Sequence, residues 1–274
     1  MVKLSAFADE ISEDLGEELD ALEANGIRAL ELRSLEKLNV LALSDEKLRR
    51  IREEITTRGF VVSSIGSPIG KVALDAPWEE HLAKFRRAIE AAKFLGAPYI
   101  RIFSYYPSGE TFRDADAAEV IRRMREKTKL AAEAGVVLLH ENEKRIYGET
   151  GRRCAEILAA VGHKNLRLAF DFANFVEAGE DTLSCWKELA PHVEYFHIKD
   201  YDASAEKTVP AGEGDGKVRE ILGEALANGF KGYLCLEPHL SQAEQFGGFT
   251  GPDRFRTAVS VLRRILSELG AKVE

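Results

Sequence analysis

Four short apolar segments in the second half of the chain each run directly into a side chain that can bind a metal ion. These side chains are Glu141, Asp171, His197 and Glu237. Three carboxylates and one neutral imidazole make a mostly oxygen ligand set, which suits Mn²⁺ or Mg²⁺, with Co²⁺ or Zn²⁺ as alternatives. Buried together without a cation, the carboxylates would repel one another and each would carry a desolvation cost. The pattern therefore predicts one divalent ion, with one or two coordination positions open for a substrate.

Each of these residues also has a simpler explanation when it is taken alone. Glu141 or Glu237 at the end of a strand could be an ion-pair partner or a helix cap. Asp171 could cap the turn before Asn174, and His197 could be a hydrogen-bonded core histidine. Independent accidents rarely produce the same event on four consecutive strands, so the repetition favours the shared metal site.

Eight repeats of a short apolar segment and an amphipathic segment account for nearly the whole chain. The expected strand and helix of each repeat are 4–8 and 15–24, 28–32 and a helix from Ser44-Asp45 to Gly59, 60–65 and 79–95, 99–103 and 115–134, 136–140 and 152–160, 166–170 and 182–189, 193–198 and 218–227, 233–236 and 253–269. Strands that alternate with helices pair in parallel through right-handed crossovers. We therefore expect an α/β protein with one domain over residues 1–274, a (β/α)₈ TIM barrel. An open sheet with a small appendage is the alternative.

In such a barrel the active site lies at the C-terminal ends of the strands. Side chains alternate along a strand, so Glu143 shares a face with Glu141, and Lys199 shares one with His197. If these faces point inward, the four metal ligands converge. Polar groups near the strand ends could bind the hydroxyl, phosphate or carboxylate oxygens of a substrate. The candidates for substrate binding are Lys199, Arg101, Lys71, Glu143, Asn174 and His239, the last being equally compatible with a surface loop.

Composition excludes several other classes of protein. Lys and Arg number 38 against 46 Asp and Glu, which gives a net charge of −8 and weighs against a nucleic-acid partner. No apolar run approaches the roughly 18–20 residues that span a bilayer, and acidic residues follow closely on Met1, so we expect a cytoplasmic protein with no membrane partner. Three scattered cysteines, Cys154, Cys185 and Cys235, indicate reduced thiols and neither a disulfide scaffold nor a zinc site.

Two further patterns bear on cofactors. No Gly-x-Gly-x-x-Gly sequence follows an expected strand, so the usual sign of a dinucleotide site is missing. The glycine-rich segment 211–216 lacks the Gly-Lys-Ser/Thr ending of a phosphate loop, and we interpret it as a flexible loop that covers the substrate. His81, His163 and His192 fall on expected helices or at their ends, where we expect them to be solvated.

The motifs around the four candidate ligands resemble those of the xylose isomerase-like barrel superfamily, in its sugar phosphate isomerase/epimerase group. The segments that carry the resemblance are 138–143, 170–174, 196–200, 210–216 and 236–239, and it extends essentially from end to end. The resemblance implies one divalent ion, commonly Mn²⁺, held by Glu141, Asp171, His197 and Glu237. It also implies a small sugar or polyol substrate and, as in many barrels of this group, a homo-oligomer, although we see no decisive interface stripe.

The resemblance suggests a mechanism as well. A metal that chelates a carbonyl and the adjacent hydroxyl stabilises the enediolate that forms when a carbon-bound proton leaves. In the ketose 3-epimerases of the superfamily the two ligand glutamates face opposite sides of the sugar, so Glu141 and Glu237 would exchange the proton. Those epimerases carry a Glu, a His and an Arg at the spacings where this chain has Tyr147, Asn174 and Ala203, so its grip on the substrate differs.

Four functions remain in competition. The leading one is a metal-dependent isomerase or epimerase of a small sugar, polyol or derivative. The nearest rival is a lyase of the inosose dehydratase type, in which the same enediolate expels a hydroxyl group and Lys199 holds a substrate oxygen. An abasic-site nuclease of the endonuclease IV type would need three zinc ions, many histidines and a basic face. A non-catalytic barrel would be expected to have lost a metal ligand, and all four are present.

Overall fold

Eight parallel strands form the centre of the molecule. A computed structural model describes residues 1–113, 115–240 and 250–274 of the chain. The strands are β1 (Lys3–Ala6), β2 (Ala29–Leu32), β5 (Val61–Gly66), β6 (Tyr99–Ile102), β7 (Val137–Glu141), β8 (Leu166–Asp171), β9 (Val193–Ile198) and β12 (Tyr233–Leu236). They pair in the order β1-β12-β9-β8-β7-β6-β5-β2, so each strand lies beside the next one in this series. A parallel bridge between Phe7 and Glu31 joins the two ends of the sheet. The predicted (β/α)₈ barrel is confirmed, and the open-sheet alternative is wrong.

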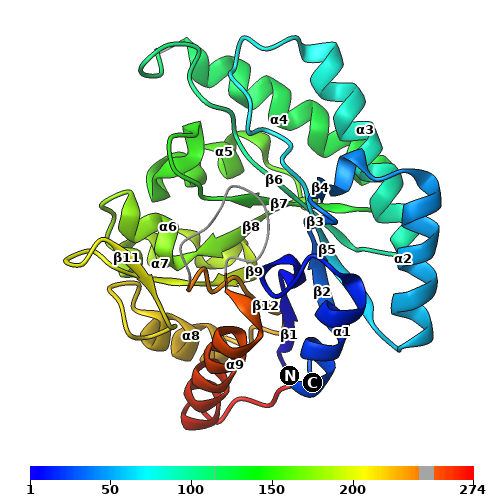
Figure 1. Cartoon of the computed structure of the whole chain (residues 1–274). Coiled ribbons are helices and arrows are strands. Elements are labelled where there is room, and N and C mark those ends of the chain that lie inside the picture. The colour runs from blue at the N-terminus through cyan, green and yellow to red at the C-terminus, as the bar shows by residue number, and fades with distance from the viewer. Residues whose placement is uncertain (114, 241–249) are drawn as a thin grey trace.

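Helices surround this barrel on the outside (Figure 1). They are α1 (Leu15–Ala24), α2 (Asp45–Thr57), α3 (Trp78–Leu95), α4 (Asp116–Glu133), α5 (Gly151–Val161), α6 (Phe172–Glu177), α7 (Thr182–Leu189), α8 (Val218–Ala227) and α9 (Gly251–Glu268). Common capping residues begin and end these helices. For example, the Ser44 side chain caps the N-terminus of α2, and Gly96 ends α3 in the left-handed conformation with φ 71°. Among the described residues, no helix is both long and apolar enough to cross a membrane.

Several short elements were not predicted. They are the hairpins β3 (Ser34–Leu35) with β4 (Leu38–Asn39) and β10 (Asp200–Asp202) with β11 (Lys207–Val209), the helix α6, and the 3₁₀ helices η1 (Ala8–Glu10), η2 (Val40–Ala42), η3 (Tyr147–Glu149) and η4 (Ala190–His192). Strands of two or three residues and single helical turns are too short to show a hydrophobic period. All of the longer elements lie within two residues of the expected bounds.

The alternation of side chains along the strands divides the core into two parts. The side chains that point into the barrel form a small cluster made of Phe7, Leu139, Ala169, Tyr195 and Cys235. Those that point outward join the larger core beneath the helices. Four of the inward residues stand two positions before the four candidate ligands. The inner cluster therefore closes the bottom of the barrel interior, and the next inward residue on each of these strands lies at the mouth of the barrel.

A second group of buried polar residues lies outside the barrel, between α3, α4 and the sheet. His81 is 4% exposed, which contradicts the expectation that it is solvated, and its ring lies 5.4 Å from that of Tyr105. Lys127 is fully buried, with Nζ 3.5 Å from the Phe103 carbonyl oxygen and 4.6 Å from the centre of the Tyr105 ring. Burial lowers the pKa of Lys127 to about 7 and that of His81 to about 3, and the positive charge of Arg123 lowers both pKa values further.

Lys127 makes the stability of the fold depend on pH. Its pKa is about 7 in the folded chain and near 10.4 in the unfolded chain, so between these values the unfolded chain binds more protons and stability rises with pH. We expect Lys127→Met to flatten this rise and to be stabilising relative to the wild type at pH 7. Urea denaturation at several pH values between 7 and 10 measures the slope. The control is Lys129→Met, whose side chain is 79% exposed on the same helix; equal slopes for the two variants would contradict the prediction.

Candidate metal centre

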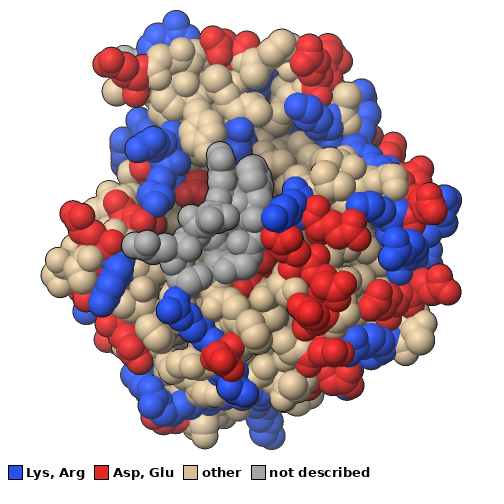
Figure 2. Space-filling model, viewed as in Figure 1, with Lys and Arg blue, Asp and Glu red and all other residues tan. Residues whose placement is uncertain are grey.

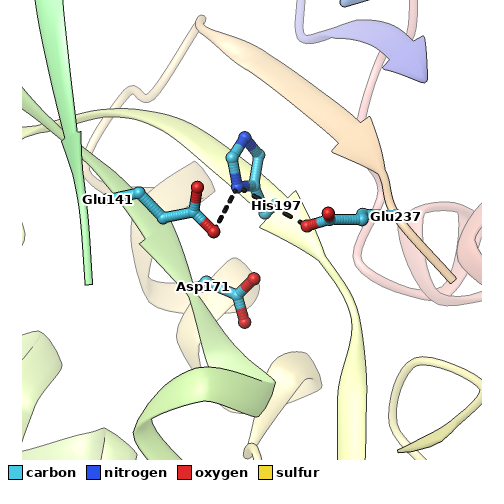
Figure 3. Close-up of side chains that lie close together, drawn as sticks. All are labelled: Glu141, Asp171, His197 and Glu237. Atoms are coloured by element: carbon cyan, nitrogen blue, oxygen red, sulfur yellow. Dashed lines mark ion pairs between the residues drawn. The ribbon is translucent and has the colours of Figure 1, made fainter. Parts of the chain in front are cut away.

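The four predicted ligands meet at the mouth of the barrel. Glu141 ends β7, Asp171 ends β8, His197 lies near the end of β9, and Glu237 directly follows β12. One ligand atom from each residue lies within 4.8 Å of the others, and no residue of the four is more than 3% exposed. Figure 3 shows the four side chains pointing toward a common centre. Because ions of this kind bind ligands at about 2.0–2.6 Å, atoms so placed fit around a single ion.

Strand register and one amide side chain hold this arrangement. Asp171 pairs with His197 across β8 and β9, which puts the two residues at the same level of the barrel. The buried Asn142 side chain donates to the Asp171 carbonyl oxygen and accepts from the Asp171 amide, each at 2.9 Å. The Asp171 carboxylate accepts a hydrogen bond from the backbone amide of Asn174 at 2.9 Å and so caps the N-terminus of α6. Asp171 therefore does cap a helix, as the simpler explanation predicted, through Oδ1. Its other oxygen, Oδ2, faces the centre.

Cations compensate the carboxylates of this centre. His197 Nδ1 lies 3.2 Å from Glu141 Oε1, and Arg101 lies 3.1 Å from Glu141 Oε2. Burial alone would raise the pKa of Glu141, but His197 and Arg101 outweigh it and lower that pKa to about 2. Lys199 Nζ lies 3.0 Å from Asp171 Oδ2 and 3.5 Å from Glu237 Oε2. Burial raises the pKa of Asp171 to about 7, since Lys199 offsets it only in part.

Glu237 has two further basic neighbours: His239, which we expected near the mouth, and Arg33, which no sequence pattern connected to it. Arg33 donates to Glu237 Oε1 at 2.8 Å, to Asp9 at 2.8 Å and to Glu10 at 3.4 Å. His239 Nε2 lies 3.3 Å from Glu237 and 2.7 Å from Glu10. Burial would raise the pKa of Glu237, but Lys199 and His239 hold it well below its usual range. The only signal in the sequence was the position of Arg33 directly after an expected strand.

A cavity of about 550 Å³ opens above the centre. Its lining includes all six predicted substrate-binding residues, Lys71, Arg101, Glu143, Asn174, Lys199 and His239. Of the four cluster residues, Glu141 and Glu237 line the cavity, whereas Asp171 and His197 lie beneath it. A cavity of this volume with charged side chains in its lining suits a small polar molecule. On the face seen in Figure 2, the described acidic and basic side chains are interspersed and form no continuous basic area.

The glycine-rich segment 211–216 does not cover this cavity, and that expectation is corrected. Its residues are absent from the cavity lining. The amides of Gly212, Gly214 and Gly216 donate to the Asp200 carboxylate at 2.8, 3.1 and 2.9 Å. A Cβ atom on Gly214 would lie 2.5 Å from the Tyr201 carbonyl oxygen, so the close approach requires glycine there. The segment is a cradle for an internal carboxylate, and it anchors the chain directly after Lys199.

Comparisons with known proteins identify the family of this chain. The family described as Xylose isomerase-like TIM barrel matches residues 19–265. A curated relative, 3-dehydroshikimate dehydratase of Bacillus anthracis, is 22% identical over 180 residues, which are 66% of this chain and 64% of that protein. The match thus spans less than two thirds of the relative's length.

Solved structures show the same fold. A xylose isomerase-like TIM barrel protein from Mycobacterium smegmatis, in complex with magnesium, has a TM-score of 0.71 and 19% identity, covering 97% of each chain. The 3-keto-D-glucoside 4-epimerase of E. coli has a TM-score of 0.73 and 17% identity, covering 96% of this chain and 98% of that one. At these identities the similarity concerns the fold.

The cluster should bind a divalent ion, and Asp171 should be needed for that binding. At 100 times its dissociation constant, Mn²⁺ should raise the free energy of unfolding by about 2.7 kcal/mol, and EDTA should remove this gain. Asp171→Asn keeps an N-cap for α6 but loses one ligand charge, so we expect weaker stabilisation by Mn²⁺. Thermal unfolding with and without Mn²⁺ measures the effect. The control is Asp181→Asn at the N-cap of α7, outside the cluster; an equal response of both variants to Mn²⁺ would rule out the role of Asp171.

Asp200 should be a large contributor to stability. Asp200→Ala leaves three backbone amides of the glycine cradle without their acceptor, and that of Gly216 is buried. We expect a loss of about 3 kcal/mol in the free energy of unfolding. Urea denaturation measures this loss. The matched control is Asp202→Ala, because Asp202 is half-buried and accepts from the amides of Ser204 and Ala205 in the same hairpin. A larger loss in the Asp202 variant would show that the cradle contributes little.

Proposed function

The chain belongs to the xylose isomerase-like TIM barrel family, and on that premise we propose that it is a divalent-metal-dependent isomerase or epimerase of a small sugar, polyol or sugar derivative. Mn²⁺ is the ion we favour, because the ligand set is three carboxylates and one imidazole. The observation that carries the proposal is the position of the two glutamates: Glu141 and Glu237 belong to the buried cluster and also line the cavity above it.

The metal and the two glutamates have separate tasks in this proposal. An ion held by the four ligands would supply positive charge that makes a hydrogen next to a substrate carbonyl more acidic. Glu141 and Glu237 reach the cavity from different strands, so each can accept or return a proton at a bound substrate. Their lowered pKa values keep both carboxylates ionised near neutral pH, which is the form a general base needs.

The surrounding basic side chains position the substrate. Arg101 and Lys199 line the cavity beside the two glutamates and can donate hydrogen bonds to substrate oxygens. Lys71 lies at the same cavity, where it donates to Glu143 at 2.6 Å. Tyr147, by contrast, donates to Glu156 at 3.0 Å and is not part of the lining, so the position at which the ketose 3-epimerases have a glutamate does not serve this cavity.

A dehydratase is the second candidate, and Lys199 favours it. Its ammonium group lies between Asp171 and Glu237 and lines the cavity, so it could donate a proton to a leaving hydroxyl group. The curated relative named 3-dehydroshikimate dehydratase adds weak support, because the identity is only 22%. Both reactions begin with removal of a proton from carbon.

Both glutamates should be required for that first step. We expect Glu141→Gln and Glu237→Gln to lower kcat by about 10²–10⁴-fold, because an amide cannot accept the proton. The assay is Mn²⁺-loaded protein in ²H₂O with candidate ketoses and inososes, followed by NMR for deuterium uptake. The control is Glu177→Gln, a cavity-lining carboxylate outside the cluster that pairs with Lys144. Full activity in both cluster variants would refute the proposal.

The same assay separates the two candidate reactions. Deuterium uptake without loss of water indicates an isomerase or epimerase, whereas loss of one water molecule from the substrate indicates a dehydratase. In the second case Lys199→Met should abolish loss of water while deuterium exchange continues, because only departure of the hydroxyl group needs the acid.

A further inference from the structure

Glu31 is a buried carboxylate in the barrel that is not one of the four candidate metal ligands. It lies on β2, is 1% exposed and is not a member of the four-residue cluster. Its Oε2 atom lies 3.3 Å from His197 Nε2. A carboxylate enclosed in this way is costly unless it has a specific partner. The imidazole of His197 is that partner.

The two nitrogens of His197 face opposite sets of carboxylates. Nδ1 lies 3.2 Å from Glu141 and 3.8 Å from Glu237, on the side of the cluster. Figure 3 shows the other ring nitrogen pointing away from that centre, and this nitrogen meets Glu31. To bind an ion through Nδ1, the imidazole must give up its Nδ1 proton and become neutral. The neutral ring carries one N–H, and a carboxylate can only accept it. A proton held on Nε2 by Glu31 leaves the Nδ1 lone pair facing the cluster.

The surroundings aim Glu31 and hold the imidazole ring. A β-bulge between β2 and β5 brings Glu31 level with Ser64, whose hydroxyl lies 3.4 Å from Glu31 Oε1. Bulges of this kind re-aim side chains beside functional sites. The rings of Phe7 and Tyr195 stand edge-on to His197 at 5.1 and 5.6 Å. The aromatic rings thus limit tilting of the imidazole, while its hydrogen-bonding direction depends on Glu31.

We propose that Glu31 is a positioning residue that fixes the tautomer of His197, so that Nδ1 is the metal-binding atom. This inference rests on the metal centre of the proposed function. Glu31 acts through His197 and touches neither the substrate nor the ion. Partners of this kind also raise the basicity of a ligand histidine, and their loss typically weakens metal binding by about 10–100-fold.

Glu31→Gln tests the proposal, because the amide keeps the size of the side chain but loses its charge and can present a donor to Nε2. We expect the dissociation constant for Mn²⁺, measured by isothermal titration calorimetry, to rise by about 10–100-fold. Glu31→Asp, which keeps the charge, should recover part of the affinity. The matched control is Glu18→Gln, a glutamate that is also 1% exposed but has no ion pair with the described cluster residues; it should bind Mn²⁺ as the wild type does.

A direct measurement on the wild-type protein makes the test independent of how the variants fold. With ¹⁵N-labelled histidine and Zn²⁺ as a diamagnetic ion, NMR should place the His197 proton on Nε2. A proton on Nδ1, or equal Mn²⁺ affinity in Glu31→Gln and the wild type, would overturn the role of Glu31. Absence of any metal binding by the wild type would instead overturn the proposed function, so the two failures are distinguishable.

Discussion

The central constraint on this protein is the concentration of carboxylates in a barrel interior that excludes water. Glu31, Glu141, Asp171 and Glu237 are each at most 3% exposed and lie around one imidazole. Such groups are tolerated only with compensating charge. Here the compensation comes from His197, Lys199, Arg101 and Arg33, which are placed beside particular oxygens of the carboxylates. A divalent ion would add charge at the one point that all four ligand residues share.

The fold meets this constraint with the simplest property of a strand, its two-residue period. The inner cluster below the mouth is apolar, and the next inward residue of β7, β8 and β9 is a candidate ligand. Parallel strands end at the same rim of the barrel, and a register shift between Leu168 and Ala169 in the β8–β9 pair puts Asp171 level with His197. A second register shift, between β2 and β5, brings Glu31 level with Ser64.

Period and strand order therefore made the barrel and the four converging side chains predictable. The other parts of the site depend on contacts between residues that lie far apart in the sequence. Arg33 and Glu237 are 204 positions apart, and Glu10 and His239 are 229 positions apart, so no local pattern connects them. Composition correctly marked segment 211–216 as a glycine-rich loop, but the acceptor that shapes it, Asp200, belongs to a hairpin of two three-residue strands too short to predict. His81 was misplaced because a helix position alone does not show whether that face meets another helix.

The two halves of the barrel contribute different groups to the cluster. The four candidate ligands come from β7, β8, β9 and the residue after β12, whereas several charged groups beside them come from the other half: Glu31 and Arg33 at β2 and Arg101 on β6. Closure of the sheet at the bridge between Phe7 and Glu31 brings the two halves into contact. In the folded chain, the charged groups beside the four candidate ligands therefore come partly from strands that are distant from them in the sequence.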